Sequence, residues 1–316
     1  MLDSQDNSEN ERRNFDPTIQ ERLEGILSEK YIHTPMNKEL WFLLEDLMLQ
    51  VNPISPKPKV MGLLITAPPH AGKTTGTRQF KKSYLENVKD ARDEDIVIFQ
   101  IPSRAQLKGV IYKLGNQIKI PDLPLSTPSS YLRYPTFVLV EKVAKKLWND
   151  GTKLVIIDEF QKLFELSSES RVEIISGFND LVNESHVPIV LVGVNGVEKI
   201  LDLEHYEDLS NLKGTFCSRF PEFKLKPWID PDDIDFIKLL HTIASDCGLS
   251  SDMNGEDFIK DFKTRKRILE MTGGLTGKII HLIKWTARQM IRSPKQKCIT
   301  SILLESTFSQ IQAKGW

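Results

Sequence analysis

The chain has 316 residues, of which 40% are hydrophobic and 27% are charged, and its formal net charge is −1 at pH 7. This composition is typical of a globular protein with room for two domains, and the small net charge excludes a general electrostatic attraction to nucleic acid. The three cysteines lie far apart, which argues against a disulfide framework or zinc site, and no apolar run is long enough for a signal core or membrane span, so we expect a cytoplasmic protein.

The first 58 residues are expected to precede the main domain. Residues 1–17 are polar and predict a tail without a packed core. Residues 18–58 predict a helical preface and linker, because apolar side chains recur at helical spacing over residues 19–27 and 40–51 and prolines follow. We expect this preface to pack against the domain that follows.

Residues 59–228 alternate continuous apolar runs with amphipathic segments, which predicts a parallel sheet flanked by helices. Five strands are expected, at residues 60–65, 95–101, 154–159, 188–193 and 222–225. Helices are expected between them, at residues 73–84, 105–118, 131–149 and 170–183. Residues 229–316 predict only helices, at 231–245, 256–271, 276–291 and 299–313. The fold class is therefore α/β: a nucleotide-binding domain with a five-stranded parallel sheet, followed by a small helical lid domain.

A phosphate-binding loop is indicated where the first strand ends. Gly72 lets the backbone approach a phosphate, Lys73 supplies a cation for the β- and γ-phosphates, and Thr74 offers its hydroxyl to Mg²⁺. The usual pattern begins with glycine, and Ala67 stands there, so the start of the loop must use ordinary dihedral angles. The alternative is a chance Gly-Lys-Thr at a helix start. The residues expected to contact ATP are Pro69, His70, Ala71, Gly72, Lys73, Thr74 and Thr75.

Two carboxylates, Asp158 and Glu159, follow four apolar residues at the end of the third expected strand. Ligands gather at the carboxyl ends of strands in parallel sheets. Asp158 is therefore expected to hold Mg²⁺ through water, and Glu159 to orient and activate the attacking water. The alternative is a strand that simply ends in a polar turn.

Three further residues are candidates for contacts with the nucleotide. Asn195 follows the fourth strand and could hold the water near the γ-phosphate, although an asparagine beside Gly196 is also common in turns. Arg219 precedes the fifth strand and is either a surface residue or an arginine finger for the γ-phosphate of a neighbouring subunit. Lys278 starts a lid helix, where a cation opposes the helix dipole, which favours a place near an anion.

Basic and hydroxyl side chains after the second strand could position the phosphates of DNA, which carries no sequence information. A solvated helix face explains these charges equally well. The candidates are Arg104, Lys108 and Lys113, with Ser126 and Thr127 in the loop beyond. The six histidines form no zinc pattern.

With these motifs in place, the chain resembles the TniB/TnsC family of AAA+ transposition regulators. The resemblance covers residues 19–292. It is carried by residues 31–75, which end in Ala71-Gly72-Lys73-Thr74-Thr75, and by residues 154–220, which begin with an apolar strand and Asp158-Glu159-Phe160-Gln161-Lys162.

The resemblance implies a slow, switch-like ATPase that binds ATP and Mg²⁺ and assembles into rings or helical filaments on duplex DNA. It implies two partners in a bacterial cytoplasm, a TniQ-type target-selection protein and a DDE transposase. By position, Lys108 and Thr127 fall where relatives present DNA-facing residues, and Lys278 falls where many carry a lid arginine. Ala67 and Lys278 depart from the usual pattern of the family. The departure at Ala67 affects how tightly the loop binds the phosphates, and the departure at Lys278 affects the rate of hydrolysis.

Two other classes of protein stay open. An AAA+ origin or helicase-loader protein would be favoured by a winged-helix domain after the lid, and we expect no such domain in this sequence. A STAND-type signalling NTPase would bind nucleotide and a protein partner but no DNA. DNA affinity that falls with rising salt would argue against this last class.

Overall fold

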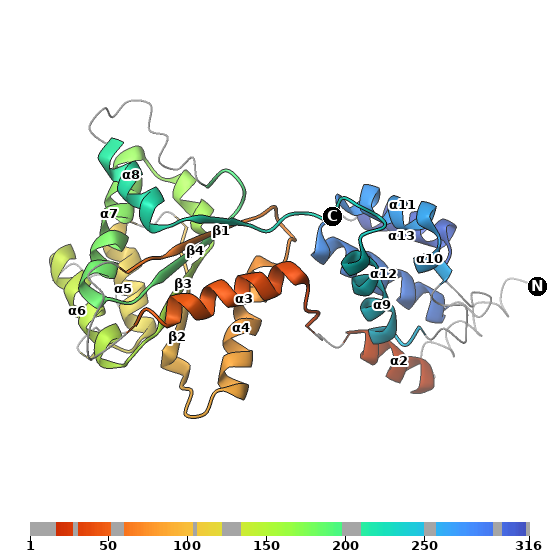
Figure 1. Ribbon diagram of the computed structural model, residues 1–316, viewed down its shortest axis with the longest axis horizontal. Helices are drawn as coiled ribbons and strands as arrows, with labels where there is room; N and C mark the ends of the chain where they lie inside the picture. The colour runs from red at the N-terminus through yellow and green to blue at the C-terminus, as the bar shows by residue number, and fades with distance from the viewer. Residues whose placement is uncertain are drawn as a thin grey trace, which may run out of the picture. The chain divides into compact units, whose positions relative to one another are not determined.

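The computed structural model describes residues 17–27, 31–51, 60–103, 106–121, 134–197, 210–249, 257–292 and 299–313. The chain forms two compact units (Figure 1). One is Met36–Leu225, and the other combines Met1–Pro35 with Lys226–Trp316. The expected tail lies outside the described residues, apart from Pro17.

The larger unit contains the predicted five-stranded sheet, and every strand pairing in it is parallel. The strand order β2-β3-β4-β1-β5 places β4 between β1 and β3 and leaves β2 at one edge. The expected α/β fold is therefore confirmed. The strands are β1 (Leu63–Thr66), β2 (Ile96–Gln100), β3 (Leu154–Asp158), β4 (Ile189–Gly193) and β5 (Glu222–Lys224).

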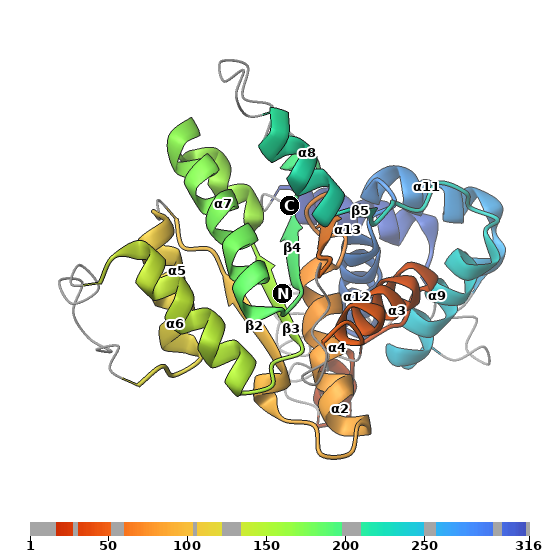
Figure 2. The same cartoon turned by 60° about the vertical axis from the view of Figure 1, so that its left-hand side comes forward.

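Helices cover both faces of this sheet, as Figure 2 shows. Successive residues of β3 face opposite sides: Leu154 and Ile156 pack with α3 and α4, whereas Val155 and Ile157 pack with the helices of the other face. Both faces are buried, which is why the strands read as continuous apolar runs. The helices are α3 (Pro35–Met48) and α4 (Lys73–Asn87) on one face, and α5 (Leu107–Gln117), α6 (Thr136–Asn149), α7 (Ser168–Ser185) and α8 (Ser210–Arg219) on the other.

Three described elements of this unit were missed by the sequence analysis. The 3-10 helix η1 (Asp93–Asp95) precedes β2, the 3-10 helix η3 (Phe160–Glu165) follows β3 after one intervening residue, and α8 leads into β5. The sequence of α8 is mostly polar and contains a glycine, so it lacks an apolar period. Tertiary packing supplies its anchor, because Phe216 is buried between Phe160 and Phe220, with ring centroids 6.4 and 4.8 Å away.

The smaller unit is helical in its described part. The turn at residues 273–275 requires a glycine at position 274, because Gly274 has a φ of +67° and a Cβ there would lie 1.9 Å from the carbonyl oxygen of Trp228. Trp228 donates a backbone hydrogen bond to Gly274 O and a side-chain hydrogen bond to Thr276 Oγ1. The helices are α2 (Pro17–Leu27), α9 (Ile234–Asp246), α10 (Asp257–Lys260), α11 (Phe262–Thr272), α12 (Thr276–Arg292) and α13 (Ser301–Gln312).

The two helices of the expected preface belong to different units. α3 packs on the sheet through Leu40 and Leu44, which are fully buried. Trp41 on α3 also donates a 3.2 Å hydrogen bond from Nε1 to Gly76 O in α4. α2 instead buries Ile26 in the core of the smaller unit, where it packs on α12. None of the described helices has the length and apolar character needed to span a membrane.

Candidate nucleotide-binding site

The predicted strand, loop and helix follow one another as expected. β1 ends at Thr66 and α4 begins at Lys73. Gly72 caps the helix with φ 95° and ψ 10°, a left-handed conformation that glycine adopts without a steric penalty. Ala67 is not among the residues with a positive φ, so the start of the loop uses ordinary dihedral angles as predicted.

The start of α4 offers backbone amides to an anion. The first hydrogen bond within the helix runs from Gly76 N to Gly72 O, over 2.8 Å. The amides of Lys73, Thr74 and Thr75 therefore precede the helical ladder, and Gly72 has no side chain that could cap them. Within the described part of the chain these three amides have no recorded acceptor. A phosphate group fits this donor set, because a helix N-terminus favours negative charge.

The ammonium group of Lys73 lies over the start of the loop. Its Nζ donates hydrogen bonds of 2.7 Å to Ala67 O and 3.0 Å to Pro68 O. Burial lowers the pKa of Lys73, and the nearby carboxylates of Asp158 and Glu159 partly oppose that shift. The side chain is thus positioned at the loop by neutral carbonyl groups, and a phosphate would offer it a charged partner.

Asp158 stands at the end of β3 and links this strand to α4. It is 2% exposed, and its Oδ2 accepts a 2.8 Å hydrogen bond from the Thr74 hydroxyl of α4. Its Oδ1 accepts a hydrogen bond from the amide of Glu159, also over 2.8 Å. The structure therefore brings together the two residues that the sequence predicts as Mg²⁺ ligands.

A magnesium ion fits here only together with other ligands. The described residues contain no group of three or more histidine, cysteine or acidic side chains that could hold a metal. Mg²⁺ requires six oxygen ligands and is usually held by one or two protein groups plus phosphates and water. Thr74 and Asp158 match that description, so the ion would bind with the nucleotide rather than before it.

Glu159 has a constrained backbone and a positioned carboxylate. Its φ of 62° and ψ of 35° are left-handed, which is uncommon for a residue with a Cβ and recurs at functional sites. Its Oε2 accepts a 2.9 Å hydrogen bond from Gln161 Nε2. Gln161 was not predicted from the sequence as a site residue. Its position two residues after Glu159, in the same motif, was the feature that could have indicated it.

Asn195 lies two residues beyond β4, and its side chain is exposed. Because β4 separates β1 from β3, this position falls between the loop and Asp158 along the carboxyl edge of the sheet. The amide of Ala67 donates a 3.3 Å hydrogen bond to Gly193 O, which joins the loop to the end of β4.

Arg219 is buried at the end of α8 rather than displayed on the surface. It is 7% exposed, and its guanidinium donates hydrogen bonds to the backbone and side chain of Asn179 and, over 2.8 Å, to Asn183 Oδ1. Burial lowers its pKa, and the charge of Asp180 partly opposes this shift. In this conformation Arg219 connects α8 to α7, and a finger role requires the side chain to leave both asparagines.

The remaining candidates lie on other elements or outside the described residues. Lys278 is partly exposed on the first turn of α12, in the smaller unit. Lys108 and Lys113 both lie on α5, but five residues rotate them about 140° around the helix axis. Arg104, Ser126 and Thr127 lie outside the described residues.

Comparison with solved structures identifies the fold as that of AAA+ proteins. The Aeropyrum pernix ORC1 protein in complex with DNA matches with a TM-score of 0.53 and 14% identity, over 91% of this chain and 68% of that one. The Aeropyrum pernix ORC2 protein in its ADP form gives 0.55 and 13%, over 90% and 72%. Drosophila ORC bound to DNA gives 0.53 and 12%, over 95% and 67%.

Comparison with curated proteins gave no match. The family model described as "Bacterial TniB protein" matches residues 22–230. This range contains the phosphate-binding loop, Asp158 and Glu159, and all five strands of the sheet. The chain therefore belongs to the TniB family.

Proposed function

We propose that this protein is an ATP-dependent, DNA-binding AAA+ regulator of transposition, which oligomerises on duplex DNA and couples a TniQ-type target-selection protein to a DDE transposase. Membership of the TniB family supports the role in transposition. The hydrogen bond between Thr74 and Asp158 is the observation that carries the ATPase part, because it places a hydroxyl and a carboxylate beside the amides that begin α4.

ATP would be held by residues 69–75, with the amides of Lys73, Thr74 and Thr75 on its phosphates. Lys73 would add its positive charge to the β- and γ-phosphates, and Thr74 and Asp158 would hold Mg²⁺. Mg²⁺, when bound, neutralises charge on the phosphate oxygens. Glu159 would take the proton of the attacking water, and Asn195 would hold that water in place.

Oligomerisation would place each nucleotide at a junction between copies. We propose that Arg219 reaches the γ-phosphate of the neighbouring copy after it leaves Asn179 and Asn183. The loss of these hydrogen bonds adds a barrier to hydrolysis, which agrees with a slow, switch-like ATPase. Lys278 would contact the phosphates from the smaller unit.

DNA contact would come from a local set of side chains, since the net charge of −1 gives no general attraction. We propose Arg104, Lys108 and Thr127 for this role. Lys113 was expected in the same set, but it lies on another side of α5, beside the edge of the sheet.

The test is electron microscopy of the full chain with duplex DNA and ATP, ADP or no nucleotide. We expect rings or filaments with ATP and separate particles without nucleotide. Lys108→Glu should weaken DNA binding and its dependence on salt, whereas Lys145→Glu, at an exposed site on α6, should not. Monomers under all three conditions would overturn the proposal.

The transposition part has its own test. ATP-dependent co-sedimentation with a purified DDE transposase and a purified TniQ-type protein is the expected result. DNA and ATP binding without any such association would instead favour an origin or helicase-loader protein, the class to which the ORC structures point by fold alone. Nucleotide binding without DNA binding would favour a STAND-type switch.

A further inference from the structure

Strand β2 is an unpaired edge of the sheet. It pairs with β3 on one side, and the sheet of the described residues ends there. An unpaired edge presents a row of backbone N–H and C=O groups to which another extended chain can bind. The question is therefore which groups of β2 are available and what surrounds them.

The backbone groups that point away from β3 are those of Ile96, Ile98 and Gln100. Asp95 O accepts a hydrogen bond from Lys153 N, and Ile101 N donates one to Asp158 O, so the odd-numbered residues face β3. Backbone direction alternates along a strand, so the even-numbered residues face outward. Ile96 is fully buried, whereas Ile98 is partly exposed and Gln100 is exposed, so the open part of this edge is at Ile98 and Gln100.

The outward carbonyl oxygen of Ile98 already accepts a hydrogen bond of the kind that an added strand would donate. The side-chain amide of Gln117, at the end of α5, donates a hydrogen bond to Ile98 O. This is the position that the backbone N–H of a neighbouring strand would take. Gln117 is exposed, so its side chain can leave without opening the core.

A hollow of about 450 Å³ follows this edge. Its floor is Ile98, Phe99 and Gln100, and α4 and α5 form its two sides. Three cations, Arg78, Lys81 and Lys113, and no carboxylate line it in the described part of the chain. The hollow therefore combines strand backbone, an apolar floor and positive charge.

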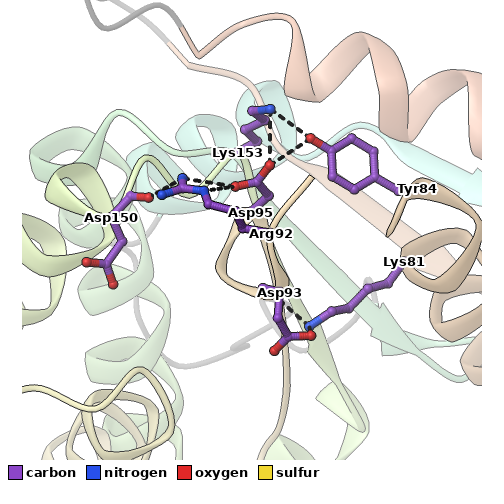
Figure 3. Close-up of polar contacts among 7 residues, drawn as sticks. All are labelled: Lys81, Tyr84, Arg92, Asp93, Asp95, Asp150 and Lys153. Atoms are coloured by element: carbon purple, nitrogen blue, oxygen red, sulfur yellow. Dashed lines mark hydrogen bonds and ion pairs between the residues drawn. The ribbon is translucent and has the colours of Figure 1, made fainter. Parts of the chain in front are cut away.

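The charge is balanced at the other end of the edge, where three lysines and three carboxylates among the described residues line a second hollow. This hollow of about 250 Å³ shares Lys81 and Gln117 with the first, and it is lined by Asp93 and Glu94 beside the start of β2. Lys81 contacts Asp93 Oδ1 over 2.7 Å (Figure 3), so its charge is partly balanced there. Positive charge without a nearby carboxylate is thus concentrated at the Gln100 end, on Arg78 and Lys113.

We propose that the edge of β2 binds an extended, acidic segment of a partner protein, which adds to the sheet as a further strand. Its backbone would pair with Ile98 and Gln100 and displace Gln117 from Ile98. Its carboxylates would lie between Arg78 and Lys113. A peptide fits better than DNA, because phosphates offer no N–H donor for the outward carbonyl groups of β2.

The probe is a short fluorescent peptide that alternates valine with glutamate, and its binding to the full chain is followed by anisotropy. A second peptide carries one central proline, which removes a backbone donor and leaves the charge unchanged. A third carries lysine in place of glutamate. We expect the first to bind and the other two to bind at least roughly tenfold more weakly.

Variants of the protein distinguish backbone pairing between the peptide and β2 from charge attraction between the peptide and the basic side chains. The double variant Arg78→Glu/Lys113→Glu should weaken peptide binding roughly tenfold, and Lys145→Glu should not change it. Gln117→Ala frees Ile98 O and should strengthen binding by about fivefold, the equivalent of one hydrogen bond. Charge attraction alone would leave Gln117→Ala without effect and would contradict the proposal.

Hydrogen exchange gives the decisive pattern. The peptide should slow exchange at the amides of Ile98 and Gln100, while Val97 and Phe99, which face β3, stay unchanged. Uniform or absent protection would overturn the proposal. If a higher protein concentration without peptide produced the same alternating protection, the edge of β2 would bind a second copy of this chain. If Lys113→Glu and Lys108→Glu lost duplex DNA binding to the same extent and Lys113→Glu still bound the peptide, the hollow would be a DNA-binding site.

Discussion

The hydroxyl of Thr74 donates a 2.8 Å hydrogen bond to Oδ2 of Asp158, and this contact joins the start of α4 to the end of β3. The two residues are 84 positions apart in the sequence. Their contact arises because β4 alone separates β1 from β3 in the sheet. Both oxygens lie beside the amides that begin α4, so one place in the fold offers donors to a phosphate and oxygen ligands to a metal ion.

Lys73→Ala should abolish ATP binding. The variant removes the ammonium group that lies over the loop, and Ala67 O and Pro68 O offer no replacement charge. Calorimetric titration with ATP and Mg²⁺ measures the effect. Lys82→Ala is the matched control, because Lys82 is an exposed residue on the same helix. Retained affinity in Lys73→Ala would mean that the loop does not bind the phosphates.

Glu159→Gln should keep ATP binding and slow hydrolysis by about 10²-fold or more, the usual contribution of a general base. Assemblies on DNA should become longer, because the bound triphosphate persists. Steady-state phosphate release measures the rate, and Glu165→Gln on η3 serves as the control. A turnover equal to that of the unaltered protein would remove Glu159 from the role of base.

Arg219→Ala should destabilise the larger unit by about 2 kcal/mol, because the buried acceptors of Asn179 lose their donor and the contact with Asn183 is also lost. Denaturant unfolding measures this loss. Asn183→Ala breaks the 2.8 Å contact from the other side and should also destabilise the unit. If Arg219 acts as a finger, hydrolysis should fall about 10³-fold in Arg219→Ala and persist in Asn183→Ala. Equal rates in both variants would leave Arg219 with its structural role alone.

Asp95→Asn should destabilise the larger unit by about 2 kcal/mol. The Asp95 carboxylate is buried at the start of β2, where it accepts hydrogen bonds from Tyr84 and Arg92 and contacts Lys153 over 3.2 Å (Figure 3). The network therefore ties α4 to β2 and β3. Urea unfolding measures the cost, and Asp93→Asn, whose side chain is 81% exposed, is the control.

The same network predicts a dependence on acid. Burial alone would raise the pKa of Asp95, but the hydrogen bonds from Tyr84, Lys153 and Arg92 outweigh it, and the pKa lies below the ordinary aspartate value of 3.8. A lowered pKa means that the ionised form stabilises the fold above pH 3.8 and that this contribution is lost as the pH falls through the lower, folded-state value. Unfolding free energies measured against pH should show this acid loss diminished in Asp95→Asn.

The sequence predicted the elements whose signal is local. The apolar run 154–157 followed by Asp158 and Glu159 predicted a buried strand with carboxylates at its end, because a strand covered on both faces needs no polar alternation. Gly72 and Lys73 predicted the loop, because left-handed geometry and a compact cation are properties of single residues. By contrast, α8 has no apolar period, and its packing on η3 through Phe216 could not be read from spacing.

The sequence by itself therefore determined that this chain has a parallel α/β domain in which a strand, a glycine-containing loop and a helix follow one another at residues 63–87. Only the tertiary structure decided that Arg219 is held by Asn179 and Asn183, that α2 packs on α12, and that β2 is the open edge beside Arg78 and Lys113. The physical reason is the range of the forces involved. Backbone preference and burial periodicity act within a few residues, whereas strand order and side-chain partners depend on segments that meet only when the chain has folded.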